Sequence, residues 1–211
     1  MLKVENLTIV KQDKVILNNC DLKIRNGEKV LIFGDSGSGK STLLKAILFF
    51  EHHSGGTVYF KGEKIDRQNI DSFRKNFVYI SQKAPSFEGS VQEYLCLPFT
   101  FKHNQHNIPT DLKKYLHKLN FPDSILKQKY DKLSGGEQQR ITILQSLLLD
   151  KSFFLLDEIT SSLDENNINQ VVKLIISDPQ RSIISISHNK EWLDCVDTIY
   201  LMNNGKLQKK E

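Results

Sequence analysis

The spacing of apolar positions near the N-terminus predicts strands. Between Leu2 and Val10, apolar residues recur at about every second position, which is typical of a strand with one buried face. Short apolar runs at 15–17 and 22–24 predict two further strands, with little room for a helix between them. Together these segments predict a small antiparallel sheet laid beside the core that follows.

Further along the chain, short apolar runs alternate with helical patterns. The runs expected to form strands are 29–33, 57–60, 77–81, 153–156, 182–187 and 198–202. The helical patterns include Gly135–Leu149 and Glu165–Ile176, each with an apolar stripe. Alternation of this kind predicts an α/β fold.

The pattern changes between Ala84 and Asp131, where most of the prolines lie. Helices are expected here at 91–95, 110–119 and 123–129. Together with the helix that follows, this region is expected to form an inserted helical subdomain of about 84–149 within a single domain of 1–211. Its prolines and loops indicate a surface used for contact.

Composition adds limits on location. The chain has 211 residues, of which 39% are hydrophobic and 26% are charged, as in an ordinary globular domain. No apolar run approaches the ~20 residues of a membrane-spanning helix. The N-terminus has no apolar signal segment, so a cytosolic location is expected.

Charge and cysteine content point to no further site. The net charge of +4 permits contact with nucleic acid or an anionic membrane, but the lysines are spread along the chain as on solvated faces. The basic residues 206–210 are expected to be a frayed end. The three cysteines are far apart and are interpreted as reduced thiols.

The most informative stretch is Gly34–Ser41, which matches the phosphate-binding P-loop pattern between a strand and a helix. Its glycines allow backbone N–H groups to converge on an anion, and the following helix directs its positive end there. We expect Lys40 to reach the β- and γ-phosphates and the Ser41 hydroxyl to bind Mg²⁺. The expected nucleotide contacts are Gly34, Asp35, Ser36, Gly37, Ser38, Gly39, Lys40, Ser41 and Thr42.

A second motif, Phe153–Glu158, ends a buried strand with two carboxylates. Asp157 is expected to hold Mg²⁺ directly or through water. Glu158 is expected to polarise the attacking water. The alternative is an acidic helix start, and the P-loop in the same chain favours the metal site.

The third motif, Leu133–Arg140, resembles the signature motif of ABC-type ATPases nearly residue for residue. In that family the motif contacts the γ-phosphate of ATP held by the partner subunit, which assigns this role to Ser134, Gly135 and Gly136. The pattern alone also fits a helix N-cap. The resemblance runs from Leu2 to Gly205 and implies a RecA-like P-loop core.

Further positions resemble landmarks of the same family. Gln82 resembles the glutamine that senses Mg²⁺ and the attacking water, and the segment 161–164 resembles the D-loop that crosses the dimer. His188 resembles the switch histidine that hydrogen-bonds the γ-phosphate. The resemblance thus implies a catalytic set of Glu158, His188, Gln82 and Lys40, and metal contacts from Ser41, Gln82 and Asp157.

Some positions depart from the family pattern. No aromatic residue lies near Lys11, where the family stacks one on adenine, so looser base selectivity is expected. Ile159 stands where proline is common, and 144–146 reads Leu-Gln-Ser in place of the frequent Ala-Arg-Ala. None of these changes removes a catalytic group.

Three segments narrow the subgroup, whereas two histidine pairs do not indicate a metal site. Residues 89–99, 121–126 and 156–161 are similar to ATPases of two-component iron-export-type transporters, the FetA/YbbL group. His52–His53 and the pair His103 and His106 lie in polar loops without a supporting ligand set. They are interpreted as solvated rather than metal-binding.

The resemblance implies Mg²⁺-dependent ATP hydrolysis that drives solute transport by a separate transmembrane permease, with iron or metal export as one possibility. It implies a homodimer with two ATP at the interface, peripheral on the inner face of the cell membrane. The alternative is a soluble ABC-type ATPase that assembles iron–sulfur clusters or another complex. Nucleic acid is not expected as a partner, because coiled-coil inserts and a tandem second ATPase domain are missing.

Overall fold

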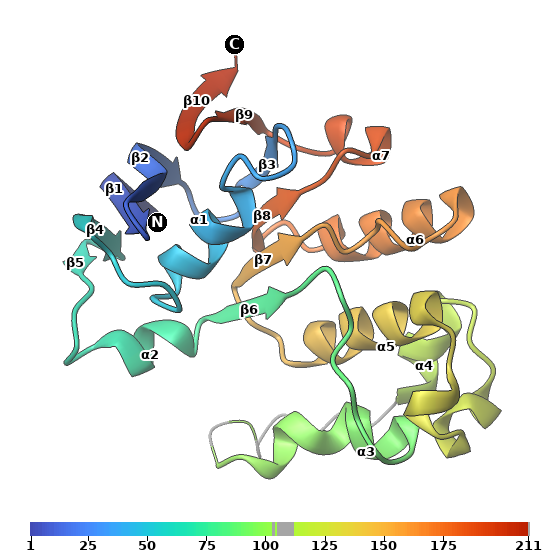
Figure 1. Cartoon of the computed structure of the whole chain (residues 1–211). Helices are drawn as coiled ribbons and strands as arrows, with labels where there is room; N and C mark the ends of the chain where they lie inside the picture. The colour runs from blue at the N-terminus through green and yellow to red at the C-terminus, as the bar shows by residue number, and fades with distance from the viewer. Residues whose placement is uncertain (103, 105–111, 211) are drawn as a thin grey trace.

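The computed structural model describes residues 1–102, 104 and 112–210, and its strands form two sheets (Figure 1). The smaller sheet has the order β2-β1-β4-β5 and is antiparallel. Its strands are β1 (Leu2–Lys11), β2 (Lys14–Ile24), β4 (Gly55–Phe60) and β5 (Glu63–Lys64). The antiparallel sheet expected from the N-terminal pattern is therefore present, and residues after the P-loop complete it.

The larger sheet has the order β10-β9-β3-β8-β7-β6. Its strands are β3 (Lys29–Phe33), β6 (Phe77–Ile80), β7 (Phe153–Asp157), β8 (Ser182–Ile186), β9 (Thr198–Asn203) and β10 (Lys206–Lys210). All neighbouring pairs are parallel except β9 with β10. The expected α/β fold with a P-loop core is confirmed.

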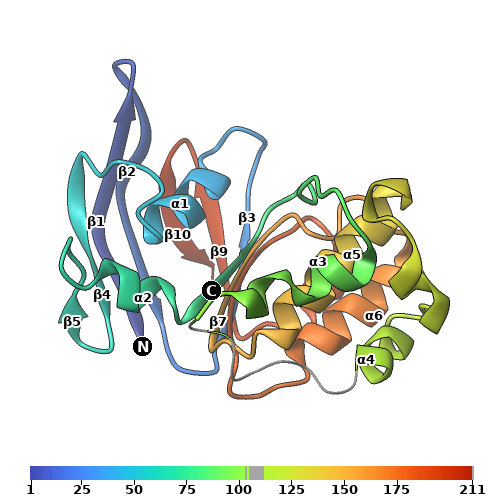
Figure 2. The same ribbon diagram turned by 90° about the horizontal axis from the view of Figure 1, so that it is seen from below.

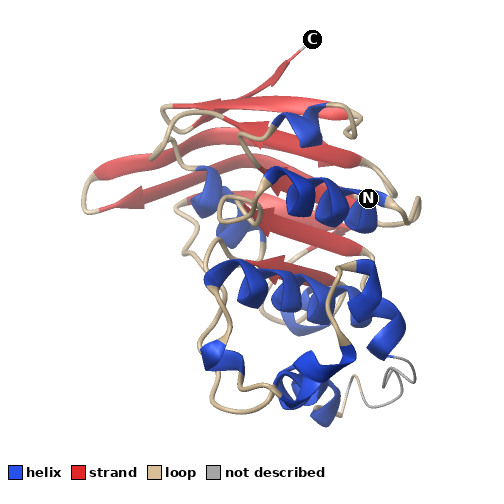
Figure 3. Ribbon diagram, turned by 90° about the vertical axis from the view of Figure 1, so that its right-hand side faces the viewer, coloured by secondary structure: helices blue, strands red, loops and turns tan. Residues whose placement is uncertain are grey.

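Helices cover both faces of the larger sheet (Figures 2 and 3). The α-helices are α1 (Lys40–Ile47), α2 (Ile70–Arg74), α3 (Val91–Cys96), α4 (Leu112–Lys118), α5 (Gly135–Leu148), α6 (Glu165–Ile176) and α7 (Lys190–Leu193). Short 3₁₀ helices are η1 (Leu97–Thr100), η3 (Asp123–Lys127) and η4 (Tyr130–Lys132).

Alternation along the buried strands builds a separate core on each face. Leu155 and Ile184 pack with α1 and the smaller sheet. Phe154 and Ile183, one position earlier on the same strands, pack with α5 and α6. As a result, α1 and α5 lie on opposite faces of the larger sheet, as Figure 2 shows.

Two local expectations were wrong. Residues 14–24 form one strand. Asn19 takes a positive φ of 48°, and irregularities in the register allow β2 to stay paired with β1 along its length. Residues 206–210 are not frayed but form β10, which pairs with β9. The turn at Asn204 and Gly205, with φ of 45° and 73°, has the backbone of a tight hairpin.

The described residues of 84–149 form helices joined by loops, and they contain no strand between β6 and β7. Helix α5 contacts α3, and it also contacts β6 and α6 of the sheet layer. It therefore connects the short helices to the sheet. Pro109, Thr110, His103 and His106 lie outside the described residues.

Among the helices of the described part, none is both long and apolar enough to cross a membrane.

Candidate functional site

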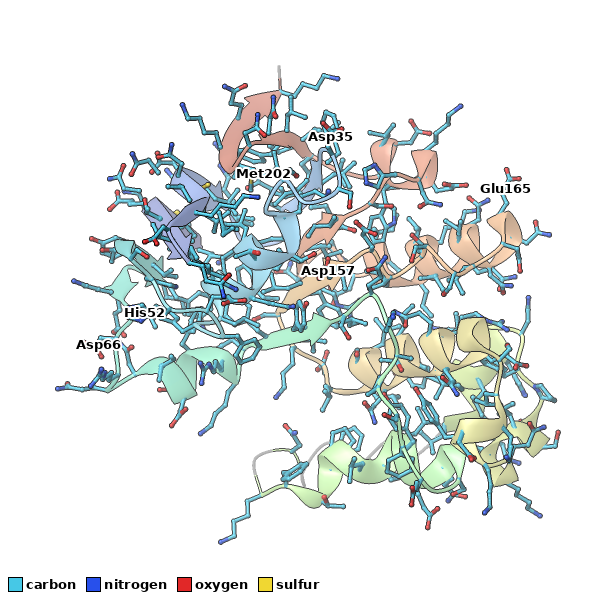
Figure 4. All side chains as sticks on the ribbon, viewed as in Figure 1. Asp35, His52, Asp66, Asp157, Glu165 and Met202 are labelled. Carbon is cyan, nitrogen blue, oxygen red and sulfur yellow. The ribbon has the colours of Figure 1, made fainter. Side chains whose placement is uncertain are left out.

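The expected site residues follow strands that are neighbours in the larger sheet. The P-loop follows β3, His188 follows β8, Asp157 ends β7, and Gln82 follows β6. These strands are parallel and adjacent in the order β3-β8-β7-β6, so their carboxyl ends meet at one edge. Figure 4 shows Asp35 and Asp157 at this edge, which is where open α/β sheets bind ligands.

The P-loop backbone requires glycine at two of its positions. Gly34 and Gly39 have φ of 148° and 109°, which side chains disfavour. A Cβ at Gly34 would overlap the carbonyl oxygen of Met202, and one at Gly39 would lie 2.9 Å from the Ile16 oxygen. The loop is therefore closely supported by β2 and by the end of β9.

Lys40 is buried, with 5% of its surface exposed. Its Nζ donates to the carbonyl oxygens of Gly34 at 2.7 Å and Asp35 at 2.8 Å, so the loop curls around the ammonium group. The Ser38 Oγ is buried and has no hydrogen-bond partner among the described residues. A cation and an unpartnered hydroxyl inside a glycine loop fit a phosphate ligand.

The Asp157 carboxylate is buried, and both of its oxygens accept hydrogen bonds. Oδ1 accepts from the Ser41 hydroxyl at 2.8 Å, and Oδ2 accepts from the Tyr79 hydroxyl at 2.9 Å. Burial and the nearby Asp157 charge raise the pKa of Tyr79, so the phenol stays a donor. A hydroxyl and a carboxylate beside a phosphate site form the hard oxygen donor set that suits Mg²⁺.

The Glu158 carboxylate has a different hydrogen-bond partner from the Asp157 carboxylate. Its backbone has a positive φ of 50°, which ends the strand conformation of β7. The Gln82 Nε2 donates to Glu158 Oε2 at 2.9 Å, and the Glu158 N–H donates to the Ile186 oxygen at the end of β8. The structure therefore brings Gln82, from the end of β6, to the second carboxylate.

His188 is exposed just after β8. Together with Phe33 at the end of β3 and Leu193 of α7 it lines a cavity of about 210 Å³. Beside it, the Asn189 N–H donates to the Ser187 hydroxyl at 3.1 Å, which shapes the turn. His188 thus stands next to the strand that leads into the P-loop.

Ser134 caps α5, as the simpler interpretation of its motif predicts. Its hydroxyl accepts from the Glu137 N–H at 3.3 Å, and Glu137 Oε2 accepts from the Ser134 N–H at 2.8 Å. The hydroxyl and backbone N–H of Ser134 lower the pKa of Glu137. A Cβ at Gly136 would lie 3.3 Å from the Ser162 oxygen, while nothing lies near one at Gly135. The motif therefore lies beside 161–164, on the opposite sheet face from α1.

Comparison with known proteins agrees with these motifs. Residues 17–161 match the family model described as ABC transporter. The chain belongs to the ABC transporter family. As a member of this family, the protein is an ATPase of the kind that drives transport by an ABC system.

Two curated relatives illustrate the range of this family. The ABC ATPase is 32% identical over 214 residues to the probable iron export ATP-binding protein FetA of Escherichia coli K12, covering 99% of this chain and 95% of that protein. It is 31% identical over 221 residues to the mitochondrial iron-sulfur clusters transporter ATM1 of Debaryomyces hansenii, covering 99% of this chain but 31% of that protein.

Among solved structures, the ABC ATPase matches a dimeric bacterial ABC transporter cassette with a TM-score of 0.85 and 24% identity. The match covers 100% of this chain and 98% of the other. At this identity the likeness shows a shared fold.

Two contacts of the ABC ATPase site were not predicted from the sequence. Tyr79 contacts Asp157, and the Gln139 Nε2, buried within α5, donates to the Ser81 carbonyl oxygen at 3.2 Å. Alternation along β6 places Tyr79 on the α1 face with Leu155, but no local pattern identifies its partner. Gln139 lies inside the signature segment and reaches the residue before Gln82.

Of the two histidine pairs, only His52–His53 lies in the part of the chain that the structure describes. No group of three or more His, Cys, Asp or Glu side chains there is arranged to hold a metal. His53 is not a solvated loop residue as expected, because its Nε2 is 2.8 Å from the Ala46 oxygen and its ring stacks on Phe49 at 4.4 Å. Burial lowers the pKa of His53, so it is a neutral structural residue.

Proposed function

We propose that this ABC ATPase binds ATP and Mg²⁺ at the carboxyl edge of the larger sheet and hydrolyses the γ-phosphate bond there. The observation that carries the proposal is the pair of hydrogen bonds Ser41–Asp157 and Gln82–Glu158. They bring a metal-binding set and a water-activating set to the end of the same strand. When bound, Mg²⁺ supplies charge neutralisation on the phosphates.

Each side chain of the site has a separate role in this proposal. Lys40 and the P-loop N–H groups bind the β- and γ-phosphates, and Ser41 with Asp157 holds the metal. Glu158 orients and polarises the attacking water, while Gln82 positions the Glu158 carboxylate by the hydrogen bond described above. His188, beside the end of β3, donates a hydrogen bond to the γ-phosphate.

We further propose that two copies pair head to tail and share two ATP molecules. In one chain the signature residues Ser134–Gly136 begin a helix on the sheet face opposite α1. Their backbone is open at Gly135, so a second copy has access to it. Each complete site then consists of one chain's P-loop and the other chain's signature helix, whose N-terminus suits a γ-phosphate.

The proposed role of this dimer is to drive solute transport through a separate transmembrane permease, with metal export as the favoured cargo class. The similarity to an iron export ATP-binding protein along nearly its whole length supports this role. Both curated relatives are named for export or transport, which favours a transporter over the soluble assembly ATPase. A position on the inner face of the membrane follows from such a partner.

The test of the catalytic proposal is Glu158→Gln. We expect the turnover number to fall at least about a hundredfold, because a general base is lost. ATP binding should persist, so size-exclusion chromatography with ATP should show a stable dimer. Glu165→Gln, on the first turn of α6, is the matched control and should behave as wild type. A Glu158→Gln protein that hydrolyses ATP normally, or stays monomeric with ATP, contradicts the proposal.

The test of the transport role is a tagged pull-down from detergent-solubilised native membranes. We expect a polytopic membrane protein in near-equal amount, and its cargo then decides whether metal export is correct. Recovery of soluble scaffold proteins alone contradicts the transporter and leaves the ATPase site intact.

A further inference from the structure

The Asp157 carboxylate is held from two sides, by Ser41 of α1 and by Tyr79 of β6. Ser41 donates to Oδ1, and Tyr79 donates to Oδ2. We propose that Tyr79 is a positioning residue that fixes the metal-binding carboxylate of Asp157, an inference that rests on the proposed Mg²⁺ site. It assigns a role to a side chain outside the nucleotide-binding motifs.

The register of the sheet explains why a tyrosine at this position reaches Asp157. In the parallel pair β6–β7, Tyr79 is the partner of Leu155, and both belong to the core on the α1 face. Asp157 is two residues further along β7, so its side chain points to the same face. A diagonal neighbour of this kind lies about 7–8 Å away, a span that a phenol crosses and a shorter side chain does not.

Packing fixes the direction of the phenol. The Tyr79 ring lies edge-on to Phe50, with centroids 6.4 Å apart and an interplanar angle of 73°. Phe50 is itself covered by the Arg74 guanidinium at 5.1 Å. Arg74 donates to the carbonyl oxygens of Leu48 at 2.8 Å and Phe49 at 3.0 Å, which ties α2 to the end of α1.

As a consequence, one oxygen of the Asp157 carboxylate is held by Tyr79, and the other is directed to the end of the P-loop. Oδ1 faces Ser41, the hydroxyl that completes the proposed metal site. Without the phenol, Asp157 gains rotation about its terminal torsion and has to be ordered when the metal binds. Removal of such a supporting partner typically lowers metal affinity about 10–100-fold.

The test is the affinity for a fluorescent non-hydrolysable ATP analogue, measured in EDTA and in saturating Mg²⁺. We expect Tyr79→Phe to keep the wild-type affinity in EDTA, because the P-loop is unchanged. The gain in affinity on adding Mg²⁺ should shrink about tenfold, and the Mg²⁺ concentration for half-maximal binding should rise to match. Tyr59→Phe, which removes a phenol hydroxyl from β4 in the other sheet, should match wild type in both conditions.

The Asp157→Asn variant distinguishes a wrong role for Tyr79 from a wrong Mg²⁺ site. If Asp157→Asn removes the Mg²⁺ gain while Tyr79→Phe retains it in full, the role of Tyr79 is wrong and the metal site stands. If Asp157→Asn also retains the full gain, the proposed metal site itself is wrong. A Tyr79→Phe protein with equal losses in EDTA and in Mg²⁺ has a general structural defect, which overturns the positioning role.

Discussion

At the scale of single residues, the site depends on two adjacent carboxylates with different surroundings. Asp157 is buried at the end of β7 and accepts from Ser41 and Tyr79. Glu158 leaves the strand with a positive φ and accepts from Gln82. A left-handed conformation costs a non-glycine residue about 1–2 kcal/mol, and such strain is characteristic of functional sites. The turn thereby separates the carboxylate proposed to bind the metal from the one proposed to activate water.

Replacing Lys40 should weaken nucleotide binding. For Lys40→Ala we expect ATP affinity to fall about 10–100-fold, since a buried, charge-assisted contact with phosphate is lost. Equilibrium binding of labelled ATP measures the change. Lys45→Ala, one turn later on α1, is the control and should bind as wild type. An unchanged affinity for Lys40→Ala contradicts the assigned phosphate contact.

At the scale of elements, α3 and α5 begin with the same kind of cap, but only the start of α5 is proposed to belong to the site. Ser90 with Glu93 and Ser134 with Glu137 each form a complete capping box. The local chemistry is therefore equal, and the cap seen at Ser134 is compatible with the second role proposed for it. Ser134 is a helix cap in its own chain, and it is proposed as a phosphate contact for the second copy.

The two N-cap serines, Ser90 and Ser134, allow the capping role to be compared directly with the proposed role in the site. Both Ser90→Ala and Ser134→Ala should destabilise the fold by about 1 kcal/mol, measured by thermal or urea unfolding, because each removes an N-cap. ATPase activity should fall strongly in Ser134→Ala only. Equal activity losses in the two variants would show that Ser134 acts through stability alone.

At the scale of the whole molecule, the sheet separates the two halves of the proposed site. The P-loop opens α1 on one face, and the signature opens α5 on the other (Figure 1). In the proposed dimer, a twofold axis would bring each P-loop to the other chain's signature helix. The proposed composite site thus depends on which helices cover which face of the sheet.

Mixing inactive variants tests that arrangement. Lys40→Ala and Ser134→Ala place both defects in one site of a mixed dimer and leave the other site intact. We expect a 1:1 mixture to regain ATPase activity, up to about a quarter of the wild-type level if the copies pair at random. Each variant alone is the control. A mixture no more active than the separate variants contradicts sites shared between copies.

The sequence predicted most elements of the fold and indicated the motif residues, for a local reason. The P-loop turn, the cap at Ser134 and the buried run before Asp157 each depend on contiguous residues. The errors also had local causes. The turn at Asn204–Gly205 closes a hairpin, so the basic tail is strand β10, and Asn19 adopts a conformation that keeps β2 continuous.

Contacts between distant segments were decided only by the tertiary structure. Ser41 meets Asp157 across 116 residues, and Gln82 meets Glu158 across 76, because β3, β8, β7 and β6 are neighbours in that order. No local spacing encodes which strand lies beside which, since that order follows from how the buried faces pack against the helices. The amino-acid sequence by itself therefore indicated which groups are proposed to carry the chemistry. The tertiary structure decided which of them meet, including the unforeseen contact of Tyr79 with Asp157.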